Sequence, residues 1–306
     1  MTRRLTVAIP SYRRPESLAL ALDGVAAAID RLAGAVDTEI LVIDNDPDRS
    51  ALPVVAARDV RYISEPTPGL SAVRNRALDE TEARDLLVFL DDDEEPDETW
   101  LVQLLRAFDS TGADAVAGKV ITPLPAGIDP WLVAVGAFVR PRRVDGQIMP
   151  QAATNNLLLD RRAVRECGVR FDPRFGLTGG EDSLFTLQFT RAGRVIRWAE
   201  HAVVHENVIP SRIDKAWILM RAYRTGNSSA RVNLAVAHGP LGRLGSRGRD
   251  VIGGLLRIAR GVVRWIVGVL GGSLPRRALG IRDVYRGAGY VSGALGSSYR
   301  EYRRVD

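Results

Sequence analysis

The chain has 306 residues, 46% hydrophobic and 26% charged, so it can bury a substantial core and does not have the composition of a disordered protein. Its single cysteine, Cys167, excludes an internal disulfide framework and fits a reducing compartment. Near the N-terminus, the apolar run 5–9 is too short for the apolar region of a secretory signal. We therefore expect a globular protein of the cytoplasm.

The net charge of +5 is distributed unevenly. Residues 1–210 hold 24 Lys and Arg against 32 Asp and Glu, whereas residues 211–306 hold 18 against 5. An acidic body followed by a basic region predicts two parts, the second lying near an anionic partner. A basic surface that only aids solubility is the alternative.

Strand and helix patterns alternate through the first third of the chain. Continuous apolar runs predict strands at 5–10, 39–46, 60–64 and 86–93, and helical patterns fall at 15–32, 70–82 and 97–110. This alternation predicts a mainly parallel, Rossmann-like α/β sheet flanked by helices. In such sheets ligands bind beyond the carboxyl ends of the strands, where this chain has polar residues.

The region 116–180 is less regular, and the end of the chain is helical. Strands are expected at 115–122, 153–160 and 195–206, helices at 161–167 and 182–193, and a helical extension from 211 onward. Within the extension, 251–270 is long enough to span a bilayer, but three arginines and four glycines argue against a spanning helix. Arg257, Arg260 and Arg264 share one helical face opposite an apolar one, as in a helix lying in a membrane interface. A helix packed on the protein body gives the same pattern.

The run VFLDDDEEPD places three aspartates directly after a strand. Asp91 and Asp93 alternate along the chain and can face one cleft, where their oxygens suit Mg²⁺ or Mn²⁺. We expect Glu94, Glu95 and Asp97 to face solvent or to lead into the next helix. A plain acidic turn is the alternative.

Three other features are weaker when taken alone. Thr178-Gly-Gly-Glu181-Asp182 sets two carboxylates at the start of a helix, as an active site or an ordinary helix cap would. His205 follows an apolar run and is either a ligand or a structural histidine. Arg74 sits early in a helix, where it would pair with a phosphate or lie on the surface.

Together, the motifs resemble the family 2 glycosyltransferases of the GT-A fold. The matching segments are VAIPSYRRPESL, ILVIDND, GLSAVRNRAL, VFLDDDEEPDETWL, TNNLLLDR, GGEDSLF, VVHENVIPSR and WILMRAYRTGNS, which span about residues 5–230. Their order is specific, although each motif alone is not. The resemblance implies a nucleotide-diphospho-sugar donor, a divalent cation and inversion at the anomeric carbon.

The resemblance also implies roles for individual residues. The implied donor-binding residues are Pro10, Tyr12, Arg13, Asp44, Arg74, Asp91 and Asp92. Asp93 matches the metal-binding residue of the Asp-X-Asp pair, and His205 matches a histidine that completes the metal site in some members. Asp182 matches the catalytic base, with Glu181 beside it on the acceptor side. Aspartate at all three positions 91–93, and a second histidine at 201, leave the choice of metal ligands open.

We therefore expect a catalytic domain over 1–210 and a basic helical region over 211–306. The expected enzyme is a metal-dependent inverting glycosyltransferase of cell-envelope polysaccharide synthesis, peripheral on the inner face of the cell membrane. Its expected partners are a nucleotide sugar, a saccharide or glycolipid acceptor and an anionic membrane surface, with no nucleic acid. The alternatives are an inactive sugar-nucleotide-binding module and a sugar-1-phosphate nucleotidyltransferase. The latter would need a glycine-rich basic loop where this chain has PSYRRPE.

Overall fold

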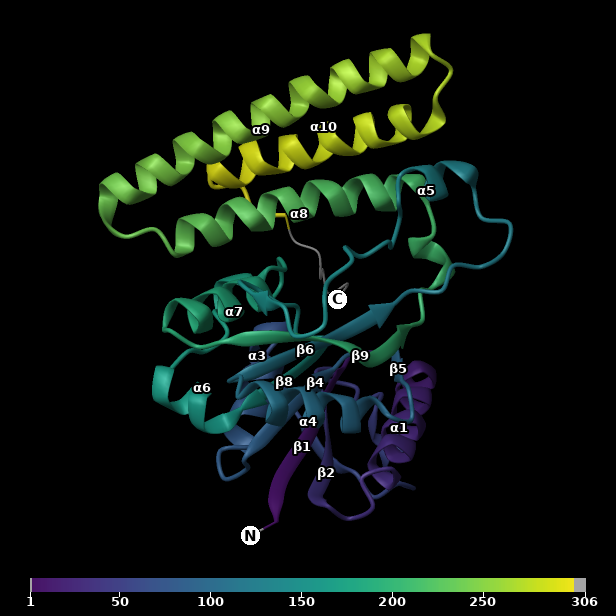
Figure 1. Cartoon of the computed structure of the whole chain (residues 1–306), viewed down its shortest axis with the longest axis vertical. Coiled ribbons are helices and arrows are strands. Elements are labelled where there is room, and N and C mark those ends of the chain that lie inside the picture. Colours follow the sequence, from purple (N-terminus) through teal and green to yellow (C-terminus); the bar gives the residue numbers. More distant parts are fainter. Residues whose placement is uncertain (1, 300–306) are drawn as a thin grey trace. The chain divides into compact units, whose positions relative to one another are not determined.

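The computed structural model describes residues 2–299 and divides the chain into two compact units (Figure 1). The first unit comprises residues 1–123, 140–176 and 181–207, and the second comprises 124–139, 177–180 and 208–306. The second unit thus includes two segments that precede the helical region expected from residue 211. The last part of that region, 300–306, lies outside the described residues.

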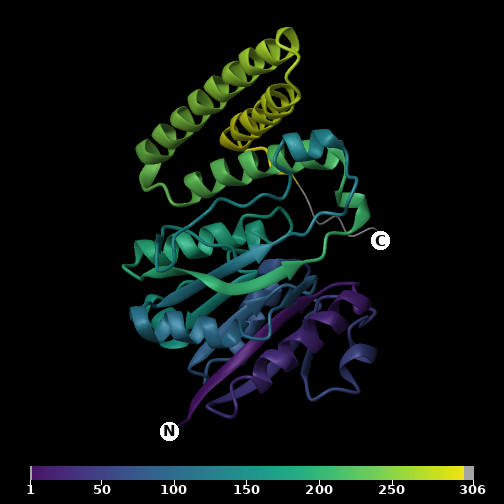
Figure 2. The ribbon, with the colours of Figure 1, turned by 45° about the vertical axis from the view of Figure 1, so that its right-hand side comes forward.

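The first unit is built on one sheet with helices on both faces (Figure 2). Its strands are β1 (Arg3–Ser11), β2 (Val36–Asp44), β3 (Arg61–Ser64), β4 (Leu86–Leu90), β5 (Glu94–Pro96), β6 (Ala115–Ile121), β7 (Ile148–Met149), β8 (Asn156–Asp160) and β9 (Ile196–Glu206). Its helices are α1 (Pro15–Asp30), α2 (Leu52–Val55), α3 (Leu70–Glu80), α4 (Trp100–Thr111), α6 (Arg161–Cys167) and α7 (Glu181–Arg191), with a 3₁₀ turn, η1, at Pro173–Phe175.

The strand order is β3-β2-β1-β4-β8-β6-β9-β5, and β7 pairs with β9. Strands β3, β2, β1 and β4 are parallel, so the carboxyl ends of all four meet at one edge of the sheet. Strand β8 is antiparallel to both β4 and β6, and β5 is antiparallel to β9. The expected α/β class, with a sheet flanked by helices, is confirmed.

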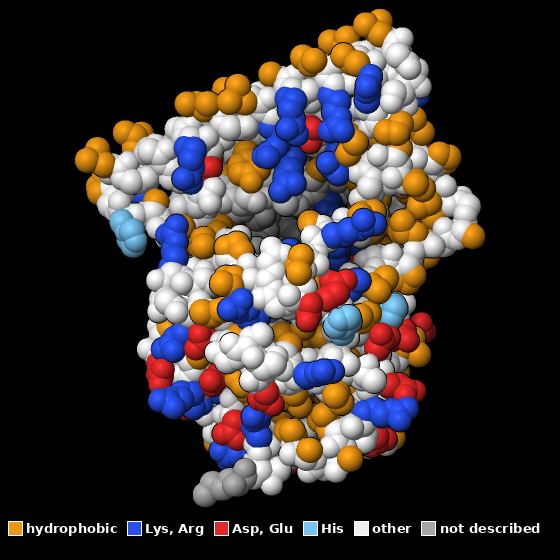
Figure 3. Space-filling view, in the orientation of Figure 1, with side chains coloured by type: hydrophobic (Ala, Val, Ile, Leu, Met, Phe, Trp, Pro, Cys, Tyr) orange, Lys and Arg blue, Asp and Glu red, His pale blue; other side chains and the backbone are white. Residues whose placement is uncertain are grey.

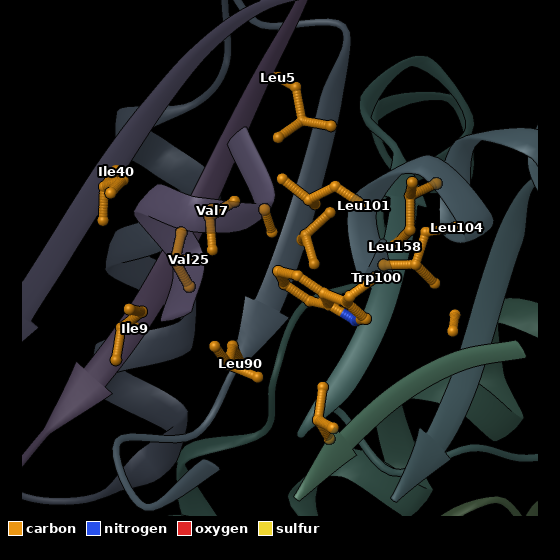
Figure 4. Packing of buried hydrophobic residues seen from close by; sticks show 14 of the residues in the cluster. Leu5, Val7, Ile9, Val25, Ile40, Leu90, Trp100, Leu101, Leu104 and Leu158 are labelled. Carbon is orange, nitrogen blue, oxygen red and sulfur yellow. The ribbon is translucent and has the colours of Figure 1, made fainter. Parts of the chain in front are cut away.

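Alternation along the strands divides the core between the two faces of the sheet. On β1, Leu5, Val7 and Ile9 pack with α1 and α4, and Trp100 fills the centre of this layer (Figure 4). On the other face, Ala8 packs with residues of α3, α6 and α7. A strand that buries both faces is apolar at nearly every position, which explains the largely apolar runs.

One expectation about the acidic run is wrong. Glu94 was expected to face solvent or to lead into a helix, but it lies in strand β5 and is only 1% exposed. Helix α4 begins later, at Trp100. The short β5 is held by its antiparallel partner, β9, which lies more than a hundred residues away in the chain. Local sequence therefore gave no sign of it.

The second unit is mainly helical. It contains α5 (Pro130–Ala134), η2 (Pro210–Arg212), α8 (Lys215–Ala235), α9 (Gly239–Leu270) and α10 (Leu274–Ala294). Helix α10 packs against both α8 and α9 (Figure 1). None of the helices between residues 2 and 299 has an apolar stretch sufficient to cross a membrane.

Glycine residues set the distance between α9 and α10. Gly254, Gly261 and Gly268 recur every seven residues and are buried in the seam. A Cβ on Gly261 would lie 2.7 Å from the carbonyl oxygen of Gly280, closer than a carbon can approach. Hydrogen in place of a side chain therefore allows the two backbones to pack closely.

Gly261→Ala is expected to lower the free energy of unfolding by about 1–3 kcal/mol, because the added methyl group must push α9 away from α10. Gly253→Ala in the same helix is the control, since its Cβ would meet nothing within 4 Å. There, alanine should raise stability by up to about 1 kcal/mol through helix propensity. Thermal unfolding followed by circular dichroism measures both. Equal effects of the two substitutions would contradict the role given to the seam.

Candidate active site

An arginine at the start of α1 joins β1 to the acidic run after β4. Nη1 of Arg14 lies 2.8 Å from Oδ1 of Asp92 and 2.7 Å from Oδ2 of Asp93. Burial acts to lower the pKa of Arg14, but the two carboxylates outweigh it and the net shift is upward. The guanidinium thus serves as the counter-ion of both aspartates.

Asp92 points back toward the loop after β1. It is 5% exposed, and the backbone N–H of Tyr12 donates to its Oδ2 at 3.3 Å. Burial is the main cause that raises its pKa to about 6, and Asp93 and Asp91 add to the rise. Asp91 is the more open carboxylate, with a 36% exposed side chain, and the pKa of Asp91 is also raised, by burial first.

Glu94 holds the acidic turn in place through hydrogen bonds. Its Oε1 accepts from the side-chain amide of Asn155 at 2.5 Å, and its Oε2 accepts from the backbone N–H of Asp91 at 3.4 Å. The N–H of Glu94 in turn donates to the carbonyl of Asp91 at 3.2 Å. Burial, reinforced by Asp91 and Asp93, raises the pKa of Glu94 well above its ordinary value.

Arg74 connects the acidic turn to the start of α7. It is 4% exposed, which contradicts the alternative of a surface arginine. Nη1 bonds Oε1 of Glu181, and Nη2 lies 3.5 Å from Oδ1 of Asp91. The guanidinium also lies 5.9 Å from the ring centroid of Phe171. Two sequence motifs that are ninety residues apart are thereby brought together.

Glu181 and Asp182 form the first turn of α7. Gly179 and Gly180, just before them, have φ of 73° and 93°, a left-handed backbone that favours glycine. Glu181 is 3% exposed, and burial, with the neighbouring Asp182, raises its pKa. Asp182 also acts to raise the pKa of Asp91, so the two carboxylates are within electrostatic range of each other.

The loop after β2 completes this edge of the sheet. Asp44 is fully buried and accepts from the backbone N–H groups of Asp46 and Ala51, each at 2.9 Å, and from the Tyr62 hydroxyl at 3.2 Å. Arg13 reaches this loop from β1, with Nε 3.0 Å from Oδ1 of Asp46. The donor-binding role that the resemblance implies for Asp44 stays a prediction. In this arrangement its carboxylate holds the loop in place.

His205 lies on β9 beside the short strand β5, paired in register with Glu95. Its Nε2 is 3.0 Å from Oδ1 of Asp97, and its side chain is 41% exposed. Because Nε2 contacts Asp97, the other ring nitrogen, Nδ1, would be the one to bind a metal, as in metal sites where a carboxylate holds the histidine. The role of His205 as a metal ligand stays a prediction.

Carboxylates outnumber cationic groups in this cluster. Arg14 pairs with Asp92 and Asp93, and Arg74 pairs with Asp91 and with Glu181 of α7, while Asp182 adds a further carboxylate beside Glu181. Between residues 2 and 299, no group of three or more His, Cys, Asp and Glu side chains is arranged to hold a metal ion. The donor set still fits Mg²⁺ or Mn²⁺, because such ions commonly use one or two carboxylates and complete their coordination with substrate phosphates and water.

Comparison with known proteins identifies the family. Residues 6–168 match the family described as Glycosyl transferase family 2. The chain belongs to this glycosyltransferase family. It is also 34% identical over 246 residues to the succinoglycan biosynthesis protein ExoM of Rhizobium meliloti (strain 1021), covering 78% of each chain.

Solved structures of S. aureus TarS share the fold of this glycosyltransferase. The TarS 1–349 complex with UDP-GlcNAc aligns with a TM-score of 0.52 at 13% identity, covering 94% of this chain and 92% of that one. The complex with UDP aligns with a TM-score of 0.52 at 15% identity, covering 98% and 93%. Against the longer TarS structure, the match covers 78% of this chain and 44% of that chain. The GT-A-type fold expected from the motifs is confirmed.

The structure of the glycosyltransferase brings most of the predicted site residues to one edge of the sheet. They are Pro10, Tyr12, Arg13, Asp44, Arg74, Asp91, Asp92, Asp93, Glu181 and Asp182. Sequence reasoning missed Arg14, Glu94 and Asn155. Arg14 follows Arg13 directly and Asn155 lies in the TNNLLLDR motif, so the family motifs themselves contain both residues. Glu94 lies within a run of acidic residues, a pattern typical of an exposed turn, so the sequence did not indicate that it is buried.

Glu94→Gln should become more stable relative to wild type as pH rises from 4.5 to 8. The raised pKa of Glu94 means that the stability contributed by its neutral form is fully present below the unfolded pKa. That stability is lost as pH rises through the pKa of Glu94 in the folded protein. Glutamine has no ionisable proton, so the stability of Glu94→Gln does not fall in this way. Urea unfolding at several pH values with EDTA present measures the difference. Glu94→Ala should lose about 1–3 kcal/mol by stranding its partners, whereas a pH-independent gap for Glu94→Gln would show that the carboxyl is not held neutral.

Proposed function

We propose that the chain transfers a sugar from a nucleotide-diphospho-sugar to an acceptor hydroxyl, with inversion at the anomeric carbon. The observation that carries this proposal is the bridge made by Arg74 between Asp91 and Glu181. It places the acidic turn, suited to a cation and a diphosphate, beside the first turn of α7, which carries Asp182. Inversion needs these two functions on opposite sides of one sugar carbon.

Asp91 and Asp93 would hold a divalent cation, Mg²⁺ or Mn²⁺, together with the donor diphosphate. When bound, the cation supplies the positive charge that stabilises the departing diphosphate. Asp91 has the more exposed carboxylate, and Asp93 shares Arg14 with Asp92. Pro10, Tyr12 and Arg13 would border the nucleotide at the carboxyl end of β1. The fold shared with TarS, which has been crystallised with UDP-GlcNAc, supports a nucleotide-sugar donor.

Asp182 would act as the general base. The attacking hydroxyl loses its proton as the new glycosidic bond forms, and a carboxylate at the start of α7 would accept it. Glu181 is held by Arg74, so it would orient the turn and face the acceptor. The carboxylates of this cluster repel one another when charged, which, in addition to burial, helps to raise the pKa values of Asp91, Asp92 and Glu181. The positive charge of a bound cation would offset this repulsion.

The acceptor would be a hydroxyl of a lipid-linked saccharide, met at the inner face of the cell membrane. Two observations support this proposal. The relative ExoM is named for the biosynthesis of succinoglycan, a polysaccharide. The region 211–306 is basic and includes a helix whose apolar side chains are exposed.

Asp182→Asn should lower transfer by about 10²–10⁴-fold, the usual contribution of a general base, while donor affinity changes little. Incorporation of labelled sugar from a panel of nucleotide sugars into membrane lipids measures transfer, and titration calorimetry measures donor binding. Glu98→Gln, an exposed acid outside the cluster, is the matched control. Lost donor binding in Asp182→Asn would remove its assignment as the base.

Mn²⁺ should raise the unfolding temperature at pH 7.5 and have little effect near pH 5. Burial raises the pKa of Asp91, so protons compete with the cation for this carboxylate as the pH falls. Without a cation the linkage has the opposite sign, because stability from the protonated Asp92 is lost as pH rises through about 6. Differential scanning fluorimetry measures both effects.

Asp91→Asn with Asp93→Asn should abolish the stabilisation by Mn²⁺, and Glu98→Gln should keep it. An Mn²⁺ effect that is equal at both pH values, or that survives the double substitution, would place the cation elsewhere.

A further inference from the structure

The outer face of α9 exposes large apolar side chains along most of the helix. We define this outer face by Leu241, Ile252, Leu255, Leu256, Val263 and Leu270, which are between 53% and 84% exposed. Hydrophobic side chains also line the outer edge of this helix in the space-filling view (Figure 3). A contiguous apolar surface of this length is unusual on a protein that has no partner for it.

The packing of α9 explains why these side chains are free of the hairpin. The seam with α10 is made by Gly254, Gly261 and Gly268, so the smallest residues of α9 face inward. Leu256, Val263 and Leu270 follow the same seven-residue spacing two positions later, which turns them away from the seam by about half a turn. The chain thus places its bulky residues where no part of the hairpin can cover them.

The charges of the hairpin all have one sign at its surface. Residues 239–294 contain ten arginines and two acids, Asp250 and Asp283. Both acids are buried, at 5% and 4% exposure. Asn233 donates to Asp250 at 3.0 Å, and Arg260 lies 3.1 Å from Asp283. The exposed ionic groups of the two helices are therefore arginines, several of which lie on the flank of α9 (Figure 3).

These charges decide which partner suits the outer face. A second copy of the chain would bring two arginine-rich hairpins together, and like charges oppose that contact. Nucleic acid would match the arginines but leave the apolar side chains without a partner. A lipid surface offers acyl chains to the leucines and valines and anionic headgroups to the arginines beside them.

We propose that α9 docks in the plane of an anionic lipid membrane, with its outer face inserted at the boundary between headgroups and acyl chains. The arginines on its flank contact the lipid phosphates. This partner deepens the proposed function, because a glycosyltransferase held at the membrane meets a lipid-linked acceptor there. The docking itself needs neither donor nor acceptor, so it is testable even if the proposed transfer fails.

The test is co-sedimentation of the full chain with vesicles, without substrate. Wild type should bind phosphatidylcholine vesicles that contain about one third phosphatidylglycerol, and bind neutral vesicles far more weakly, with an affinity that falls as salt rises. The double variant Leu256→Ser/Val263→Ser should bind at least about tenfold more weakly. The control Leu20→Ser/Val144→Ser removes two side chains of similar exposure, 51% and 74%, from the first unit and should bind as wild type does.

A second variant separates charge from apolar contact. Arg249→Gln removes an exposed arginine seven residues before Leu256, on the line of the outer face, and leaves the ion pairs of Asp283 intact. It should weaken binding to anionic vesicles roughly fivefold, with no change on neutral ones. Circular dichroism and thermal unfolding establish that each variant is folded. Equal binding to neutral and anionic vesicles, or unchanged binding by Leu256→Ser/Val263→Ser, would overturn the proposal. A third result would also overturn it: wild type does not bind vesicles but forms a dimer in sedimentation velocity, and Leu256→Ser/Val263→Ser abolishes that dimer.

Discussion

The buried guanidinium of Arg74 is the interaction on which the arrangement of the site depends. It bonds Glu181 at the start of α7 and reaches Asp91 at the end of β4. A carboxylate buried without a partner is costly, and removing one member of a buried ion pair leaves its partner uncompensated. Arg74 therefore fixes where α7 begins relative to the acidic turn, and Arg14 does the same between the turn and β1.

The two arginines do not balance all of the acids around them. The pKa values of Asp91, Asp92 and Glu181 are all raised, chiefly because burial penalises their charged forms. In the proposed reaction, this crowding of carboxylates would be relieved by a cation. A cation that enters with the donor diphosphate would relieve the repulsion, so the free energy of the empty site would contribute to the selectivity for a metal-bound donor.

Much of this site could be predicted because parallel strands bring their carboxyl ends together. Polar residues after β1, β2 and β4 had to meet at one edge once those strands were recognised. Two of the three residues that were missed, Glu94 and Asn155, depend on antiparallel strands that enter the sheet from later in the chain. Asn155 reaches Glu94 from the start of β8, and β5 exists only through its pairing with β9. Neither pairing leaves a periodic pattern in the sequence around Glu94.

The helical hairpin is a second case in which the sequence pattern predicted an element but not its packing. The amphipathic pattern of 251–270 fitted either a membrane-facing helix or a helix packed in the protein, because the pattern alone does not say which face is covered. The structure shows that glycines make the seam with α10, and the larger apolar residues are left outside.

A helix that packed through its leucines would bury more apolar area and gain more stability. Glycine in the middle of a helix costs stability as well. Both losses, repeated at Gly254, Gly261 and Gly268, would be offset if the exposed leucines contact the proposed membrane, whose anionic headgroups would suit the arginines of this surface.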